Sequence, residues 1–291
     1  MLRQWFFWWL GVGILFANKV RYRFTGYHRP REFSVDDTGR AVKYDHEVVE
    51  RWEKVLIERG FGSQPFVGQR ILELGPGADL GVGLILVAKG ASSYVAYDKN
   101  PLADRAPKVL HTAVIDSIND GGARARASEA LTAYEHKQPT SLLFKQDDSF
   151  SFKWIPDGSI DLVVSNAAFE HFDHVPEILA QVARILAPGG ALVAHVDLQT
   201  HTRVIRDRDP LNIYRYPRLL YRLARFSGIP NRVRPALYEK VLSDHGLSMI
   251  EIIPETVLDE QKLKRDRPYV SSRYRKDPTL GVLSFIVIAK K

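Results

Sequence analysis

Three glycines in the first half of the chain have a spacing that suits a small-molecule binding site. Gly75 and Gly77 lie in residues 73–81, between a predicted strand and a predicted helix. Glycine lets the backbone turn sharply and approach a ligand closely, because it has no Cβ. With Gly81 the spacing is Gly-x-Gly-x-x-x-Gly, whereas dinucleotide-binding dehydrogenases have Gly-x-Gly-x-x-Gly. The turn therefore predicts a ligand site and favours a ligand other than a dinucleotide.

Acidic residues follow the next two predicted strands. Asp98 ends a strand at residues 93–98, where an acid in a doubly wound fold accepts hydrogen bonds from ribose hydroxyls. Asp147 and Asp148 follow a strand at residues 142–146, where a carboxylate can accept a hydrogen bond from an adenine amino group. Asp147, nearer the strand, is the preferred one of the pair. The alternative is a solvated acid at a strand end for Asp98 and a solvated loop acid for Asp147 and Asp148.

The elements that must position these residues alternate between strands and helices. The strands lack a period-two pattern, which indicates a parallel sheet covered on both faces. Strands are predicted at residues 70–74, 93–98, 142–146, 160–165 and 191–196, and helices at residues 35–59, 80–89, 107–119, 123–136 and 175–186. Two more strands, at residues 248–253 and 283–289, are joined by a long polar stretch in which no helix is predicted. They favour a hairpin that closes one edge of the sheet.

Two further motifs make the chain resemble a known family. Asn166 is followed by Glu170 and His171 after the fourth strand, and Leu-x-Pro-Gly-Gly occupies residues 186–190 before the fifth. With the glycine turn and the acids, these motifs resemble those of class I S-adenosylmethionine-dependent methyltransferases. Their order is most similar to that of the methyltransferase type 11 group, over about residues 67–196. The family often has small residues where this chain has Pro76 and Asp79, which are tolerated variants.

The resemblance implies a fold, a cofactor and a set of binding residues. It implies an α/β, doubly wound, Rossmann-like sheet of seven strands with an antiparallel last strand. The cofactor would be S-adenosyl-L-methionine, with its methionine part at the glycine turn, its ribose at the acid after the second strand and its adenine at the acid after the third. The residues so assigned are Glu73, Gly75, Pro76, Gly77, Gly81, Asp98, Asp147, Asp148 and Asn166.

His171 is the candidate catalytic residue. Methyl transfer from a sulfonium is a displacement whose activation is built into the cofactor, so the protein mainly aligns the reactants. An acceptor hydroxyl or protonated amine must also lose a proton, and a histidine, with an ordinary pKa of about 6.5, suits a general base. The alternative is that Glu170 and His171 cap the following helix and shape the pocket.

Glu170, His171, Asp173 and His174 are also potential metal ligands. No further histidine group with ligand spacing completes a site, so the sequence predicts no bound metal. The chain has no cysteine, which excludes disulfides, thiolate metal sites and cysteine nucleophiles and fits a reducing compartment.

An excess of basic residues favours anionic partners. The net charge is +7, and residues 203–234 hold nine arginines and two aspartates with tyrosines interleaved. We expect residues 201–235 to form a lid-like insertion that selects an anionic acceptor or rests on anionic lipid. The alternative is a solvated helix face. Nucleic acid is not favoured, because no recognised nucleic-acid module occurs.

The N-terminal segment, residues 1–20, is apolar and aromatic. Its uninterrupted run is shorter than the about 20 apolar residues of a transmembrane helix, and its tryptophans are typical of a membrane interface. Three interpretations stay open: membrane association, a helix docked on the protein's own body, and a signal peptide. The bulky aromatics and the missing cleavage site count against the last. The basic residues Lys19, Arg21 and Arg23 would keep the remaining chain in the cytoplasm, at the inner face of the membrane.

The sequence as a whole predicts a cytoplasmic methyltransferase with a small-molecule, lipid-linked or glycan acceptor. Residues 21–62 would form a connector and capping helix, and residues 63–291 the methyltransferase domain. One rival is an NAD(P)-dependent oxidoreductase, for which the chain lacks a Tyr-x-x-x-Lys pair. Another is a non-catalytic cofactor-binding module at the membrane.

Overall fold

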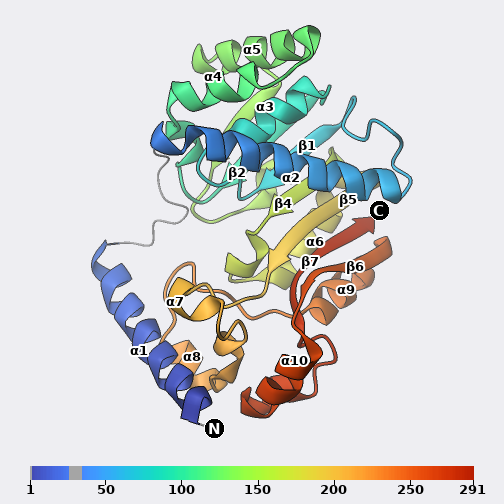
Figure 1. The fold of residues 1–291 in the computed structure, drawn as a ribbon. Coiled ribbons are helices and arrows are strands. Elements are labelled where there is room, and N and C mark those ends of the chain that lie inside the picture. Colours follow the sequence, from blue (N-terminus) through green and yellow to red (C-terminus); the bar gives the residue numbers. More distant parts are fainter. Residues whose placement is uncertain (1, 26–34) are drawn as a thin grey trace.

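A mixed sheet of seven strands forms the centre of the molecule (Figure 1). The computed structural model describes residues 2–25 and 35–291. The strands are β1 (Arg70–Leu74), β2 (Ser93–Asp98), β3 (Leu142–Gln146), β4 (Ile160–Asn166), β5 (Leu186–Asp197), β6 (Ser248–Val257) and β7 (Val282–Lys290), in the order β3-β2-β1-β4-β5-β7-β6. Neighbours among β1 to β5 are parallel, and β7 lies antiparallel between β5 and β6. The predicted α/β fold with an antiparallel last strand is confirmed.

Helices cover both faces of the sheet. They are α2 (Thr38–Glu58), α3 (Gly81–Ala88), α4 (Lys108–Asp116) and α5 (Gly121–Glu135) on one face, and α6 (Val175–Ile185) and α9 (Pro235–Asp244) on the other. Successive residues of a strand point to opposite faces, so Ile71 packs in the core under the first group and Leu72 in the core under the second. Both faces of β1 are therefore apolar, which explains why its sequence lacks alternation.

Local sequence accounts for where these helices begin and how they pack. Asp120 caps α5, because its carboxylate accepts a hydrogen bond from the backbone N–H of Ala123 at 2.6 Å. α3 is apolar all round, and every one of its residues is buried. Such a helix belongs in the interior, and its position fixes the strand-to-helix turn at residues 75–80.

A third group of helices gathers at the end of the molecule opposite α4 and α5 (Figure 1). It contains α7 (Arg203–Arg206), α8 (Arg218–Leu223), α10 (Glu260–Asp266) and α11 (Ser272–Arg275), and α1 (Leu2–Thr25) lies beside it. We call this group the cap. The prediction of no helix between the last two strands was wrong, because α10 and α11 lie there. α10 is short and mostly polar, and it begins where the carboxylate of Asp259 accepts a hydrogen bond from the Lys262 N–H.

The helix α1 docks on the cap through one face. Its residues Gln4, Phe7, Gly11 and Leu15 recur every three or four positions and are buried. The Gln4 side chain donates a hydrogen bond to Asp266 at 2.6 Å. Of the three interpretations, the structure therefore shows the second: α1 is a helix docked on the protein's own body.

The connector predicted at the start of residues 21–62 is only partly described. The helix α1 extends through residues 21–25, and residues 26–34 lie outside the described residues. Within the described ranges, no helix combines the length and the hydropathy needed to cross a membrane.

Candidate functional site

The glycine turn opens onto a large cavity at the carboxyl ends of the parallel strands. The cavity has a volume of about 1560 Å³, and its wall includes Gly75, Pro76 and Gly77. Gly75 has φ +73° and Gly77 has φ +89°, a left-handed conformation that favours glycine. A Cβ on Gly75 would lie 2.5 Å from the Cβ of Ala168, which follows β4. Glycine is therefore required by both the turn and the close approach of β4.

Three carboxyl groups converge beside this turn. Glu73 is the next-to-last residue of β1, Asp79 precedes α3, and Asp45 projects from α2; all three border the cavity. Burial and the neighbouring carboxyls raise the pKa of Asp45 to about 9 and that of Glu73 to about 8. One carboxylate oxygen of Asp45 has no hydrogen-bond partner in the described part of the chain. The group is thus suited to a cationic ligand, because a positive charge would offset the cost of burying carboxylates.

Asp45 was missed in the sequence, although a signal was present. It lies on the apolar face of α2, three residues before Val48 and seven before Trp52, where an acid is unusual. Gly81, predicted to bind the cofactor, begins α3 and makes room for Asp45. A Cβ on Gly81 would lie 2.0 Å from the Asp45 carboxylate.

Asp98 lies where the sequence predicted it. It ends β2, borders the cavity and accepts a hydrogen bond from the N–H of Asn100 at 2.7 Å. Burial raises the pKa of its carboxyl. A carboxylate held at this point can accept hydrogen bonds from a diol.

Of the two acids after β3, Asp148 borders the cavity and Asp147 does not, within the described ranges. Asp147 is engaged inside its own loop, where Tyr97 and Ser149 donate hydrogen bonds to it, and these bonds lower its pKa to about 2. The preference for Asp147 is therefore not supported by the geometry. Phe150 borders the cavity nearby and stacks on Tyr97 with ring centroids 4.6 Å apart, which gives the wall a flat apolar surface.

Asn166 ties α2 to the end of β4. Its side-chain amide donates a hydrogen bond to the Tyr44 hydroxyl at 2.6 Å and accepts one from Arg51 at 3.0 Å. Both partners come from α2. Asn166 borders the cavity, so the predicted residue has a place in the site and also holds α2 across the cavity.

Glu170, His171 and His201 form a cluster on the wall of the same cavity. Glu170 lies in the short helix η4 (Phe169–His171), is buried, and has a pKa that burial raises well above its usual range. His201, on the segment after β5, places its Nε2 3.8 Å from a Glu170 carboxylate oxygen. The two imidazole rings lie 4.8 Å apart. His201 was missed because only the fold brings it next to residues thirty positions earlier.

The other two potential metal ligands named from the sequence lie apart from this cluster. Asp173 forms an ion pair with Arg225, and His174 lies 3.9 Å from Glu177 on the exposed start of α6. Glu170, His171, Asp173 and His174 therefore do not form a single group of metal ligands.

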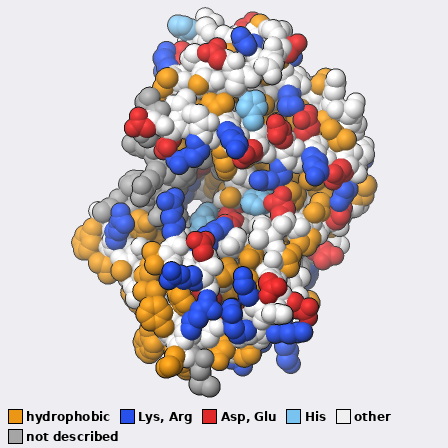
Figure 2. Space-filling model, viewed as in Figure 1, with side chains coloured by type: hydrophobic (Ala, Val, Ile, Leu, Met, Phe, Trp, Pro, Cys, Tyr) orange, Lys and Arg blue, Asp and Glu red, His pale blue; other side chains and the backbone are white. Residues whose placement is uncertain are grey.

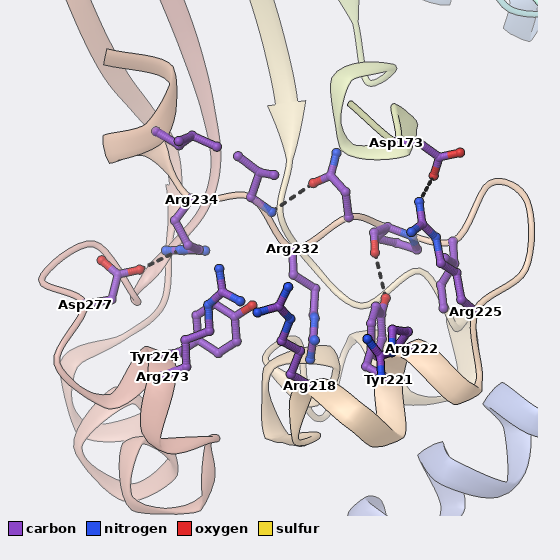
Figure 3. Close-up of a pocket in the computed structure, with 15 residues that line it drawn as sticks. Asp173, Arg218, Tyr221, Arg222, Arg225, Arg232, Arg234, Arg273, Tyr274 and Asp277 are labelled. Carbon is purple, nitrogen blue, oxygen red and sulfur yellow. Dashed lines mark hydrogen bonds and ion pairs between the residues drawn. The ribbon is translucent and has the colours of Figure 1, made fainter. Parts of the chain in front are cut away.

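A second cavity, of about 500 Å³, adjoins the first and is lined by arginines (Figure 3). Asp173 belongs to the walls of both cavities. The labelled residues come from the loop before α6, from α8, from residues 225–234 and from the segment around α11: they are Asp173, Arg218, Tyr221, Arg222, Arg225, Arg232, Arg234, Arg273, Tyr274 and Asp277. We call this space the arginine cavity.

The charges around the arginine cavity are only partly balanced. Arg225 pairs with Asp173, and Arg234 pairs with Asp277 at 2.8 Å. In the described part of the chain, no carboxylate lies within ion-pair distance of Arg218, Arg222 or Arg273.

Arg232 is also buried in this wall. Its guanidinium stacks on Tyr221 at 3.7 Å, and its Nε has no hydrogen-bond partner within the described ranges. The wall therefore has an excess of positive charge.

Comparison with known proteins gives one family match. The family described as a methyltransferase domain matches residues 44–252. No curated protein matches the sequence. The match covers the glycine turn, all nine predicted cofactor-binding residues and the cluster at the end of β4.

Several solved structures are similar in fold. The CurJ carbon methyltransferase is 16% identical with a TM-score of 0.45, over 84% of this chain and 54% of that one. An S-adenosylmethionine-dependent methyltransferase from Mesorhizobium loti is 18% identical with a TM-score of 0.42, over 78% and 92%. The YcgJ protein from Bacillus subtilis is 16% identical with a TM-score of 0.43, over 84% and 96%. The chain thus spans about half the length of the CurJ carbon methyltransferase structure, 54% of that chain. These likenesses concern the fold alone.

Proposed function

Since the chain belongs to the methyltransferase domain family and is a class I S-adenosylmethionine-dependent methyltransferase, we propose that it methylates an anionic acceptor. One observation carries the proposal: the arginine cavity adjoins the cavity beside the glycine turn, and the two share Asp173. An acceptor could thus place its anionic group among the arginines and its nucleophile at the larger cavity.

The larger cavity suits S-adenosylmethionine in charge and size. The cofactor supplies a methyl group already activated by a sulfonium. Its cationic amino group would lie near the carboxyls of Asp45, Glu73 and Asp79, one of whose oxygens lacks a partner in the described ranges. Asp98 would accept hydrogen bonds from the ribose hydroxyls, and Asp148 with Phe150 would bind the adenine.

The acceptor's nucleophile would lie beside the cluster at the end of β4. His171 borders the cavity there, and its Nδ1 lies 2.7 Å from the carbonyl oxygen of Gly228. A carbonyl oxygen only accepts hydrogen bonds, so Nδ1 carries the proton and Nε2 is the basic nitrogen. The general-base role predicted for His171 stays a prediction, and it requires this nitrogen.

The arginine cavity would bind the anionic part of the acceptor. A phosphate or carboxylate matches the fork of a guanidinium, and Arg218, Arg222 and Arg273 have no carboxylate within ion-pair distance in the described ranges. Binding there would fix the distance from the anionic group to the reacting atom, and such alignment is the protein's main contribution to methyl transfer.

Steady-state kinetics would test the acceptor class. Formation of S-adenosylhomocysteine is measured with panels of hydroxylated and amine compounds, each supplied with and without a phosphate group. We expect turnover of phosphorylated members only. Arg273→Gln should raise KM about 10-fold or more, since a charge-assisted hydrogen bond is worth about 1.5–3 kcal/mol, while kcat changes little.

Two controls make that result specific. Lys43→Gln removes an exposed basic residue on α2 that borders neither cavity and should leave the acceptor KM unchanged. Asp98→Asn should weaken cofactor binding in calorimetry, which reports the cofactor site separately. Equal turnover of neutral and phosphorylated acceptors, or an unchanged KM in Arg273→Gln, would rule out the anionic acceptor.

We also propose that the outer face of α1 rests on a membrane surface with anionic lipid. Hydrophobic side chains gather along α1, with lysines and arginines beside them (Figure 2). The exposed apolar residues of this face are Leu2, Trp5, Phe6, Trp9, Phe16, Val20 and Phe24. On α8, Leu219 and Leu223 are also exposed, and the Lys19 side chain of α1 donates a hydrogen bond to the Leu223 carbonyl oxygen. An in-plane helix with aromatic and basic side chains suits a bilayer interface. This arrangement favours the lipid-linked class among the anionic acceptors.

A further inference from the structure

The cluster at the end of β4 has the composition and spacing of a metal site. We propose that Glu170, His171 and His201 bind a divalent transition-metal ion. Each residue offers one ligand atom, and these three atoms lie within 4.8 Å of one another. The inference departs from the sequence prediction of no metal, because His201 has no ligand spacing to Glu170 or His171 in the sequence and only the fold brings it near them.

The two histidines are oriented as metal-binding histidines commonly are. Nδ1 of His171 lies 2.7 Å from the carbonyl oxygen of Gly228, and Nδ1 of His201 lies 2.9 Å from that of Gln199. Each Nδ1 must donate the hydrogen bond, because a carbonyl oxygen has no proton to give. In the neutral ring, Nε2 then carries the lone pair that binds a metal, and the backbone bond fixes the ring's orientation.

Glu170 provides a buried carboxyl that needs a partner. Only 2% of its surface is exposed, and neither carboxylate oxygen has a hydrogen-bond partner in the described part of the chain. A buried carboxylate is costly unless a cation or hydrogen bonds offset its charge. The arginine nearby, Arg206, is engaged with Asp197 at 2.6 Å. A bound divalent ion would supply the missing positive charge.

The distances require only a small adjustment. Metal–ligand bonds to histidine nitrogen and carboxylate oxygen are about 2.0–2.2 Å long, so two ligands of one ion lie roughly 3–4 Å apart. The 3.8 Å between His201 Nε2 and the Glu170 carboxylate already falls in that range. The widest separation, at most 4.8 Å, must shorten by up to roughly 1 Å, which small side-chain rotations can provide.

The ligand set indicates the class of ion. Two imidazoles and one carboxylate suit zinc, iron, cobalt or nickel, whereas magnesium and calcium prefer oxygen ligands alone. Three protein ligands leave further coordination positions, as in catalytic sites, and the cluster borders the cavity where the acceptor would lie.

A role for the ion in catalysis rests on the proposed function. An ion at this point would lower the pKa of an acceptor hydroxyl. With its Nε2 bound to the ion, His171 would act as a metal ligand and not as the general base, so the hydroxyl proton would pass to solvent. The oxygen would then form its bond to the methyl carbon. The carbon–sulfur bond would break with its electron pair left on sulfur.

The site is tested by metal binding to the full chain without an affinity tag. After treatment with a chelator, the protein is titrated calorimetrically with Zn²⁺, and with Co²⁺ while visible absorption is recorded. We expect one ion per chain and the visible d–d bands of Co²⁺ bound to imidazole nitrogen. His201→Ala and Glu170→Gln should weaken binding at least about 10–100-fold, because loss of even an outer-shell partner has that effect.

A matched control is His174→Ala, which removes an exposed histidine on the same segment and should bind Zn²⁺ like the wild type. Calorimetry with S-adenosylmethionine shows that each variant is folded, and no acceptor is needed. Failure of the acceptor hypothesis would therefore not affect the result. If the wild type takes up no stoichiometric Zn²⁺ or Co²⁺, or if His201→Ala binds as tightly as the wild type, the metal site does not exist.

Discussion

At the scale of single residues, the carboxyls beside the glycine turn determine how the free protein responds to pH. The folded-state pKa of Asp45 is about 9 and that of Glu73 about 8, while the unfolded values are about 3.9 and 4.3. Between about pH 4 and 9 the folded protein therefore binds more protons than the unfolded chain, and its free energy of unfolding falls as the pH rises. Below about pH 4 both states are protonated and this contribution is constant.

Thermal unfolding of the cofactor-free protein should show this dependence. We expect Tm to fall from pH 6 to pH 9 and the slope to decrease in Asp45→Asn, whose side chain does not titrate. Binding of the cationic cofactor should release protons, because a positive charge lowers the pKa of the carboxyls. Calorimetry in buffers of different ionisation enthalpy measures that release. A Tm that rises over this pH window, or equal slopes in wild type and variant, would contradict the assignment.

Sequence patterns predicted the position of a site residue only where a nearby element, such as the end of a strand, determines that position. Asp98 follows from its place at a strand end, because the carboxyl ends of parallel strands share one edge of the sheet. Asp45 and His201 could not be assigned in this way. Asp45 reaches the site because α2 lies across the cavity, and His201 because the segment after β5 folds back toward η4.

At the scale of elements, α1 contains two glycines, Gly11 and Gly13, and its docking depends on the first. A Cβ on Gly11 would lie 1.9 Å from the Tyr216 hydroxyl oxygen and 2.3 Å from the Asn212 side-chain oxygen, whereas a Cβ on Gly13 meets no atom within 4 Å. Gly11→Ala should destabilise the docked helix by about 1–3 kcal/mol through overpacking. Gly13→Ala should stabilise it by up to about 1 kcal/mol, since alanine favours a helix.

Denaturant unfolding measured by tryptophan fluorescence compares the two variants, because Trp8 of α1 packs on Tyr216 of the cap. The expected effects have opposite signs, which makes the pair its own control. Equal changes in both variants would mean that α1 does not dock through the face that contains Gly11.

The elements divide into those that local sequence determines and those that distant contacts determine. The five parallel strands and their helices have apolar runs, caps and glycine turns, so each could be predicted from its own residues. The helix α10 makes a distant contact instead: the Gln4 side chain of α1 donates a hydrogen bond to Asp266 of α10, far away in the sequence. Because α10 is polar and is stabilised by such a distant contact, its sequence has no apolar periodicity from which a helix could be predicted.

At the scale of the whole molecule, the cap and α1 place an apolar, basic surface next to the arginine cavity. The side chains of α8 connect the two, because Arg218 and Arg222 line the cavity while Leu219 and Leu223 are exposed. A protein that rests on a bilayer through α1 would therefore have its arginine cavity near the lipid headgroups, which links the proposed acceptor class to the proposed membrane surface.

Co-sedimentation with lipid vesicles would test this orientation. The wild type should bind vesicles of phosphatidylcholine mixed with phosphatidylglycerol, bind less at high salt, and bind weakly to phosphatidylcholine alone. Trp5 and Trp9 are 55% and 64% exposed, and replacing both with serine should weaken binding at least about tenfold, since burying one apolar side chain contributes about 1.5–3 kcal/mol. Val109→Ser is the control, because Val109 is also exposed and lies on α4, at the opposite end of the molecule (Figure 1). If the tryptophan variant and the control bind the mixed vesicles equally well, α1 is not the membrane-binding surface and its apolar face must have another partner.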